Sequence, residues 1–176
     1  MNMKIFLVSI NKDSLFDIAD NLYKLNEALS ISPCFSTDVQ YKDTLTYNTY
    51  YLDAETIRIA YKNNSLLCVV TNNYISSGIT IDDFYNNDIF IMNIKEYNTI
   101  PNKIFNNYDV VTIWIDTKNS SKISPMDMIE VNFFIERLEN LDYLYFLDNE
   151  KLIEETIYKF INADEEEKNK ILLENN

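Results

Sequence analysis

The chain of 176 residues contains a single glycine, Gly78, where average usage would give roughly a dozen. Glycine is needed where a ligand approaches the backbone closely, and loops that wrap a phosphate contain several glycines. A glycine-rich phosphate loop is therefore excluded. Asparagine is the opposite extreme, with 24 residues. Because asparagine tolerates left-handed backbone conformations, we expect it to replace glycine in some of the turns.

The absence of histidine removes further kinds of site. Zinc sites of the usual cysteine and histidine kind and histidine-based catalytic triads cannot form. The two cysteines, Cys34 and Cys68, lie among apolar residues and lack a Cys-x-x-Cys spacing. With no histidine to activate either thiol, we expect both to be reduced core residues. The sequence predicts no metal site, no cofactor and no catalytic residue.

A net charge of −13 and a pI of about 4.3 restrict the partners. An acidic surface repels nucleic-acid phosphates, so direct binding of DNA or RNA is disfavoured. The charge fits a well-solvated surface, a basic protein partner, or imitation of the charge of a nucleic acid. No apolar run is long enough to span a membrane, and Met1 to Ile10 is too short and strand-like for a signal peptide. We expect a cytoplasmic protein of one domain.

Apolar periodicity predicts an α/β chain. Continuous apolar runs rich in β-branched residues indicate buried strands, and apolar residues at three- and four-residue steps indicate amphipathic helices. The predicted strands are Lys4 to Ile10, Ile31 to Thr37, Leu66 to Thr71, Tyr74 to Thr80, Asp88 to Ile94, Asp109 to Ile115 and Tyr143 to Leu147. The predicted helices are Ser14 to Leu29, Leu52 to Asn63, Met126 to Leu138 and Asn149 to Asn162. The charged tail from Ala163 is expected to extend the last helix into solvent or to be frayed.

Five sequence strings occur in an order that resembles guanylate kinase, a nucleoside monophosphate kinase. They are CFSTD (Cys34 to Asp38), TYYLDAETI (Thr49 to Ile57), YISSGIT (Tyr74 to Thr80), DIFIMNI (Asp88 to Ile94) and LDYLYFLDNEKLIEETI (Leu141 to Ile157). The resemblance implies a three-layer α/β fold, with a mostly parallel sheet, flanking helices and a small β-rich insertion. It also implies one domain, with a core of residues 1–35 and 86–162, a nucleoside-monophosphate-binding-like insertion of about 36–85 and a charged tail of 163–176.

The resemblance also marks residues that could still bind a nucleotide. Tyr50, Gly78 and Thr80 match positions of the family's nucleotide site, and the only glycine of the chain coincides with the family's glycine there. Asn93 stands at the end of a strand where the family has a functional aspartate. These four residues are the residual nucleotide-binding candidates.

The chain departs from the family at the residues that perform the family's reaction. Phosphoryl transfer there requires a glycine-rich loop followed by a lysine and a hydroxyl residue. SINKDSL (Ser9 to Leu15) stands at that place, so Lys12 and Ser14 mark a degenerate phosphate loop. An exposed turn residue is the better interpretation of Lys12.

Groups that would bind phosphate or base are missing too. Asp38 stands where the family has a phosphate-binding arginine, and Cys68 replaces an acidic residue that reads guanine. The lid that should supply further arginines would lie at Thr117 to Arg137. The chain has only two arginines, Arg58 and Arg137.

Two functions and a variant follow from these observations. The first is a catalytically inactive guanylate kinase-like domain that binds or inhibits a basic protein, such as one that processes nucleic acid. The composition is compatible with a phage or other viral origin, in which case the protein would act in the host cytoplasm. The alternative is a divergent nucleoside monophosphate kinase or nucleotide-binding protein that uses Tyr50, Thr80 and Asn93. The variant is an acidic decoy that occupies the DNA-binding channel of another protein.

Overall fold

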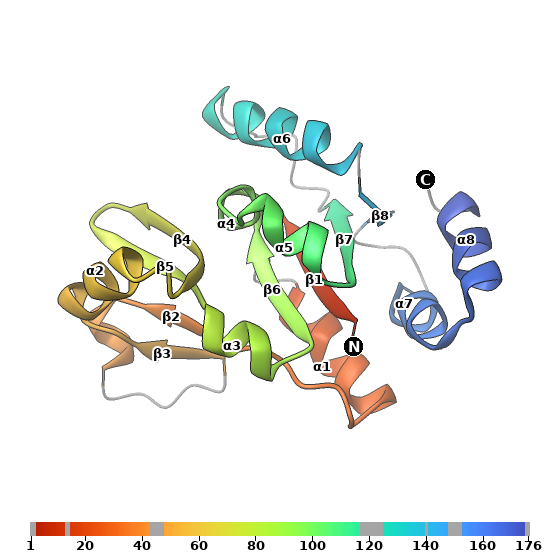
Figure 1. Ribbon diagram of the computed structural model, residues 1–176, viewed down its shortest axis with the longest axis horizontal. Helices are drawn as coiled ribbons and strands as arrows, with labels where there is room; N and C mark the ends of the chain where they lie inside the picture. The colour runs from red at the N-terminus through yellow and green to blue at the C-terminus, as the bar shows by residue number, and fades with distance from the viewer. Residues whose placement is uncertain are drawn as a thin grey trace.

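The computed structural model describes residues 3–12, 15–42, 48–116, 125–139, 141–147 and 153–174. Its central sheet, sheet A, has four parallel strands (Figure 1). In sheet order they are β6 (Ile89–Asn93), β1 (Lys4–Ser9), β7 (Val110–Asp116) and β8 (Tyr143–Leu147). Every residue of β1 is buried, because β1 has a neighbour on each side and helices over both faces. This position explains its unbroken apolar sequence.

A second, mixed sheet, sheet B, lies beside the first (Figure 1). Its order is β3 (Thr49–Tyr51), β2 (Cys34–Ser36), β5 (Ile75–Thr80) and β4 (Leu66–Asn72). β2 and β3 are parallel, whereas β5 pairs antiparallel with both β2 and β4. Helix α2 (Ala54–Lys62) and a 3₁₀ turn, η2 (Val39–Tyr41), complete this β-rich part of the chain.

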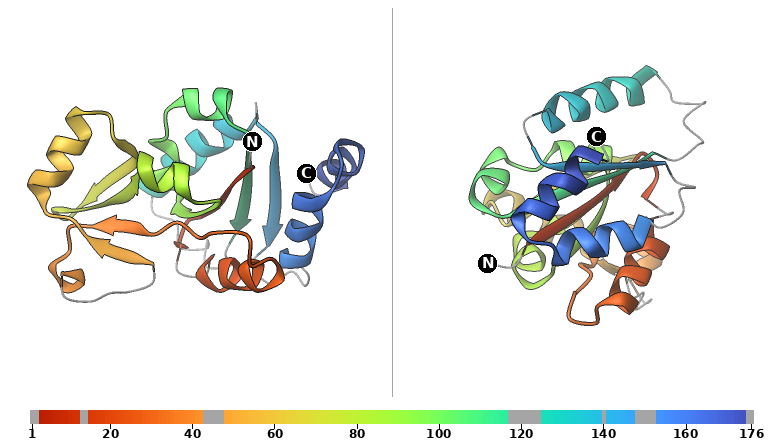
Figure 2. Two further views of the ribbon diagram at one scale, coloured as in Figure 1. Left: turned by 60° about the horizontal axis from the view of Figure 1, so that its bottom comes forward. Right: turned by 90° about the vertical axis from the view of Figure 1, so that its right-hand side faces the viewer.

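Helices cover both faces of sheet A and make it the middle of three layers (Figure 2). One layer holds α1 (Leu15–Leu25), α7 (Ile153–Asn162) and α8 (Glu165–Glu174), and the other holds α3 (Ile81–Asn86), α4 (Ile94–Asn98), α5 (Asn102–Asn107) and α6 (Pro125–Leu138). Ile5 and Leu7 of β1 face the first layer, and Phe6 and Val8 face the second. The three-layer α/β fold with a mostly parallel sheet is thereby confirmed.

The second apolar cluster continues from sheet A into sheet B. Phe6 and Phe90 belong to the same buried cluster as Cys34, Cys68 and Ile79 of sheet B. The two sheets therefore share one core. Both cysteines are buried and free, as expected from their apolar contexts.

Trp114 of β7, the only tryptophan, packs helix α6 against the sheet. Its ring lies edge-on to Phe134 of α6, with 5.4 Å between centroids, and edge-on to Tyr145 of β8 at 4.8 Å. Such aromatic pairs contribute about 1 kcal/mol each beyond the area they bury. The indole N–H of Trp114 is buried and has no hydrogen-bond partner in the described part of the chain.

Two helix ends differ from the prediction. α1 ends at Leu25 rather than Leu29, because the side chain of Asn26 accepts a hydrogen bond from the Ala28 N–H at 3.1 Å and forms a turn there. The tail is neither frayed nor a continuation of α7. It forms the separate helix α8, which the Asp164 side chain caps by accepting from the Glu167 N–H and which packs Ile171 onto the core. No helix of the described ranges is long and apolar enough to cross a membrane.

Asparagine does take the place of glycine in turns. Asn64, which follows α2, and Asn73 have φ values of 53° and 48°. The turn between β4 and β5 lies one residue later than predicted, because Asn72 pairs with Ile75 and leaves Asn73 and Tyr74 as the two central residues. Both have positive φ, as in a type I′ turn, whose second position favours glycine. Tyr74 holds that position with a φ of 67° and a fully exposed side chain.

Replacing Tyr74 by glycine should stabilise the protein, because the left-handed conformation is costly for tyrosine and the exposed ring loses no packing. We expect the free energy of unfolding to rise by about 0.5–1 kcal/mol, the unfolded-state entropy of glycine offsetting part of the gain. Urea unfolding followed by tryptophan fluorescence measures it. As the control, Tyr61→Gly removes another exposed tyrosine, from helix α2, and should lower stability by about 1 kcal/mol. Destabilisation by both variants would contradict the turn assignment.

Candidate functional site

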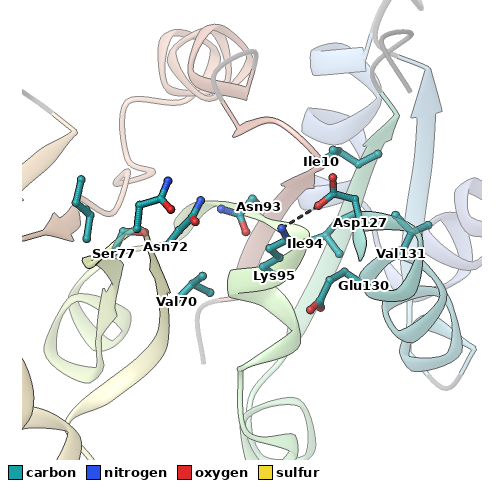
Figure 3. A pocket seen from close by; sticks show the side chains of 12 residues that line it. Ile10, Val70, Asn72, Ser77, Asn93, Ile94, Lys95, Asp127, Glu130 and Val131 are labelled. Carbon is teal, nitrogen blue, oxygen red and sulfur yellow. Dashed lines mark ion pairs between the residues drawn. The ribbon is translucent and has the colours of Figure 1, made fainter. Parts of the chain in front are cut away.

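A cleft of about 460 Å³ opens between the two sheets and helix α6. Figure 3 shows Val70 and Asn72 of β4 on one side and Glu130 and Val131 of α6 on the other. Its floor is formed where β1 and β6 end, at Ile10, Asn93 and Ile94; Asn73, Ile75, Ser77, Lys95 and Asp127 complete the lining. Ligands of open α/β sheets bind outside the carboxyl ends of parallel strands, so this is the place to look for function.

The Glu96 carboxylate is buried beside this cleft, with a side-chain exposure of 1%. It accepts hydrogen bonds from the Lys12 Nζ at 2.9 and 3.2 Å. It also accepts from the Ser77 hydroxyl at 2.9 Å and the Asn93 N–H at 3.0 Å. These donors come from the loop after β1, from β5 and from the end of β6. One carboxylate therefore connects sheet A to sheet B.

The expectation that Lys12 is an exposed turn residue is wrong. Its side chain is 23% exposed and forms the ion pair with Glu96. Burial opposes the charge of the ammonium group, but the negative charges that Cys34 and Glu96 can carry outweigh it, so the pKa of Lys12 is raised. Lys12 stays protonated at neutral pH, and its charge is neutralised inside the protein. Ser14, the other residue of the degenerate loop, lies outside the described residues.

Asn93 lines the cleft but also has a structural role. Its side chain accepts from the Glu96 N–H at 2.9 Å, while the Glu96 side chain accepts from the Asn93 N–H. This reciprocal capping box begins helix α4. We did not identify Glu96 from the sequence, although the Asn-x-x-Glu spacing directly after a buried strand is a capping signal that could have revealed it.

Tyr50 and Thr80 come together through Asp83, a residue of the first turn of α3. The Tyr50 hydroxyl donates to Asp83 Oδ2 at 2.7 Å, and the Thr80 hydroxyl donates to the same oxygen at 2.6 Å. Burial, followed by the hydrogen bond to Asp83, raises the pKa of the Tyr50 phenol. Thr80 caps α3 at the same time. Neither Tyr50 nor Thr80 lines the cleft described above.

Gly78 is required by the packing of sheet B. A Cβ atom at this position would lie 2.1 Å from the Cys68 carbonyl oxygen and 2.9 Å from the Phe35 ring. The backbone of Gly78 does not have a positive φ, so the requirement is close approach rather than conformation. Cys68 is buried beneath it, and burial raises the pKa of the Cys68 thiol well above its usual range. Burial likewise raises the pKa of Cys34, to about 11.

The residues that replace or could replace phosphate-binding arginines have other partners. Asp38 caps η2 by accepting from the Gln40 N–H at 3.0 Å. Arg137 donates to the Tyr97 and Asn98 carbonyls at the end of α4 and stacks on the Phe105 ring at 4.5 Å. Arg58 pairs with Glu55 on the surface of α2. Residues 117–124 of the expected lid lie outside the described residues.

The charges around the cleft do not favour an anion. Lys95 forms an ion pair with Asp127 at 2.8 Å (Figure 3). Glu130 accepts from the Asn98 side-chain amide at 2.8 Å and pairs with no cation of the described residues. Among the lining residues, two carboxylates thus face one ammonium group. Within the described ranges no three histidine, cysteine, aspartate or glutamate side chains gather as metal ligands.

The likeness to known proteins lies in the fold. No family model and no curated protein sequence matches the chain. Among solved structures, the chain is similar to the crystal structure of guanylate kinase from Anaplasma phagocytophilum, with a TM-score of 0.60 and 16% sequence identity. The match covers 92% of this chain and 85% of that chain. The chain therefore has a guanylate kinase-like fold.

Removing the Lys12 ammonium should strongly destabilise the protein. In Lys12→Met the Glu96 carboxylate loses its counter-ion inside the core, and breaking a buried ion pair on one side costs about 3 kcal/mol or more. Urea unfolding measures the loss. The double variant Lys12→Met/Glu96→Gln should recover most of it, because the remaining glutamine is neutral. A loss below about 0.5 kcal/mol for Lys12→Met, the size expected for a surface substitution, would show that the pair does not hold the sheets together.

Proposed function

We propose that the protein is a catalytically inactive guanylate kinase-like domain that binds a basic protein. The observation that carries the proposal is the ion pair of Lys12 with the buried Glu96 carboxylate. Lys12 follows β1, at the position where the family resemblance places the phosphate-binding lysine. The Glu96 carboxylate neutralises the charge of Lys12 within the protein. The loop contains no glycine that would expose backbone N–H groups to a phosphate.

The transition state of phosphoryl transfer supports the same conclusion. Its negative charge is spread over the phosphoryl oxygens and is stabilised by several cations at once. Lys95, which lines the cleft, and Lys12 beside it are already paired with Asp127 and Glu96. Arg137 binds backbone carbonyls, and Glu130 adds negative charge to the cleft. A bound phosphate would be repelled where it should be held.

The surface supports a basic protein as the partner. At a net charge of −13, attraction to a basic protein accelerates the encounter, whereas nucleic acid is repelled. Several large apolar or aromatic side chains are exposed and offer contact area, among them Tyr61, Tyr74, Ile129 and Phe133. Aromatic and aliphatic anchors of this kind carry most of the energy of protein interfaces.

A nucleotide panel tests the loss of nucleotide chemistry. We expect GMP, ATP with Mg²⁺, and both together to leave the melting temperature unchanged, and no ADP to form from GMP and ATP. An active guanylate kinase under the same conditions is the positive control. A ligand at 100 times its Kd would stabilise the protein by about 2.7 kcal/mol. Clear stabilisation by ATP or GMP would overturn the proposal and favour the nucleotide-binding alternative.

A further inference from the structure

We propose that a groove between the free edge of β4 and helix α6 binds an extended segment of a basic protein, which adds to sheet B as a further strand. The segment places an apolar side chain against Phe133 and, two residues along, a lysine or arginine against Glu130. The basic character of this partner rests on the function proposed above. The groove itself rests on the backbone edge, the apolar helix flank and the position of Glu130.

The backbone of β4 offers hydrogen-bonding groups on its outer side. β4 is the edge strand of sheet B and pairs only with β5. In an antiparallel pair, alternate residues direct their N–H and C=O groups away from the partner strand. Val69 is one of these residues, because its N–H donates outward to the Thr99 hydroxyl at 3.2 Å. Thr71, two residues along, has the same orientation, so its backbone groups face the groove.

Helix α6 supplies the opposite, apolar wall. Phe134 and Leu138 attach the helix to the core. Ile129 and Phe133 lie on another flank of the helix and are 68% and 54% exposed. Between this flank and β4 runs a groove of about 640 Å³, lined also by residues of α4 and the turn after it. An open strand edge facing an apolar wall suits an extended backbone with one apolar side chain.

Charge complementarity selects the segment. Glu130 lines both this groove and the neighbouring cleft, and its carboxylate points from α6 toward α4, where one oxygen accepts from Asn98 (Figure 3). Lys95, which also lines the groove, is paired with Asp127, so Glu130 is the charged group of the lining that pairs with no cation of the described residues. Side chains two apart on a strand are about 6.6 Å apart on one face, which matches residues one helical turn apart on α6. A second copy of this chain would bring another net charge of −13 to the contact and is disfavoured.

A labelled peptide and paired variants test the groove. The probe is a fluorescein-labelled heptapeptide with threonine at its odd positions and leucine, arginine and leucine at its even positions, measured by fluorescence polarisation. Phe133→Glu should weaken binding about tenfold or more, as loss of an interface anchor does. The matched control is Ile135→Glu, which adds the same charge to an exposed residue on the other flank of α6 and should change the Kd less than about twofold.

Two further variants separate the backbone edge from the charge. Thr71→Pro removes an outward N–H and spares the backbone hydrogen bonds to β5, although it loses the hydroxyl contact of Thr71 with Ser76; it should weaken peptide binding about tenfold. Glu130→Gln should weaken peptide binding less than Thr71→Pro does, and it should reduce the salt dependence of the Kd. Thermal unfolding of each variant establishes that it is folded, and Ile129→Glu replaces Phe133→Glu should the latter fail to fold.

Each result of these binding measurements either supports or overturns the proposed groove. The groove is supported if Phe133→Glu and Thr71→Pro weaken peptide binding while Ile135→Glu leaves the Kd unchanged. Equal binding by all three variants places basic segments elsewhere and overturns the groove, while the proposed function stands. Absence of peptide binding to the wild-type chain, or a dimer in sedimentation that Thr71→Pro dissociates, also overturns it. Failure of the proposed function is seen separately, as stabilisation by nucleotides.

Discussion

The buried carboxylate of Glu96 sets the constraint on which the arrangement of the two sheets depends. A charge at 1% exposure is tolerated only where a counter-ion and hydrogen-bond donors surround it. Its donors are Lys12 after β1, Ser77 on β5 and the backbone of Asn93 at the end of β6. Displacing sheet B from sheet A would strip at least one of them from a buried anion. Apolar packing through Phe6, Cys34 and Ile79 gives the attraction between the sheets, and Glu96 gives the geometry.

In this guanylate kinase-like fold, the lysine after the first strand contributes to internal cohesion. In an open site, a lysine after the first strand would attract phosphate. Here a carboxylate on α4 and a serine on β5 occupy its surroundings. Arg137 is likewise bound within the protein, since its guanidinium group donates to the carbonyls at the end of α4. The cations remain in the chain, but each of these two is committed to the protein itself.

The sequence predicted the fold better than the site. Strands such as β1, β6 and β7 were found because burial on both faces demands a continuous run of apolar, β-branched residues. Asparagine as a glycine substitute was foreseen from its tolerance of positive φ. The environment of Lys12 was missed because its partner is 84 residues away, and only the fold brings the two together. Helix α8 was missed because its charged sequence conceals Ile171 and Leu172, the apolar residues that pack it onto the core.

The position of Trp114 has a spectroscopic consequence. The only indole of the chain lies between α6 and β8, edge-on to Phe134 and Tyr145, with its N–H shielded from solvent. Its emission wavelength and quantum yield depend on those two rings remaining in contact. Helix α6 carries a wall of both the cleft and the adjoining groove. The protein thus contains an intrinsic optical reporter for any movement of that wall, and binding there becomes observable without attaching a dye to the chain.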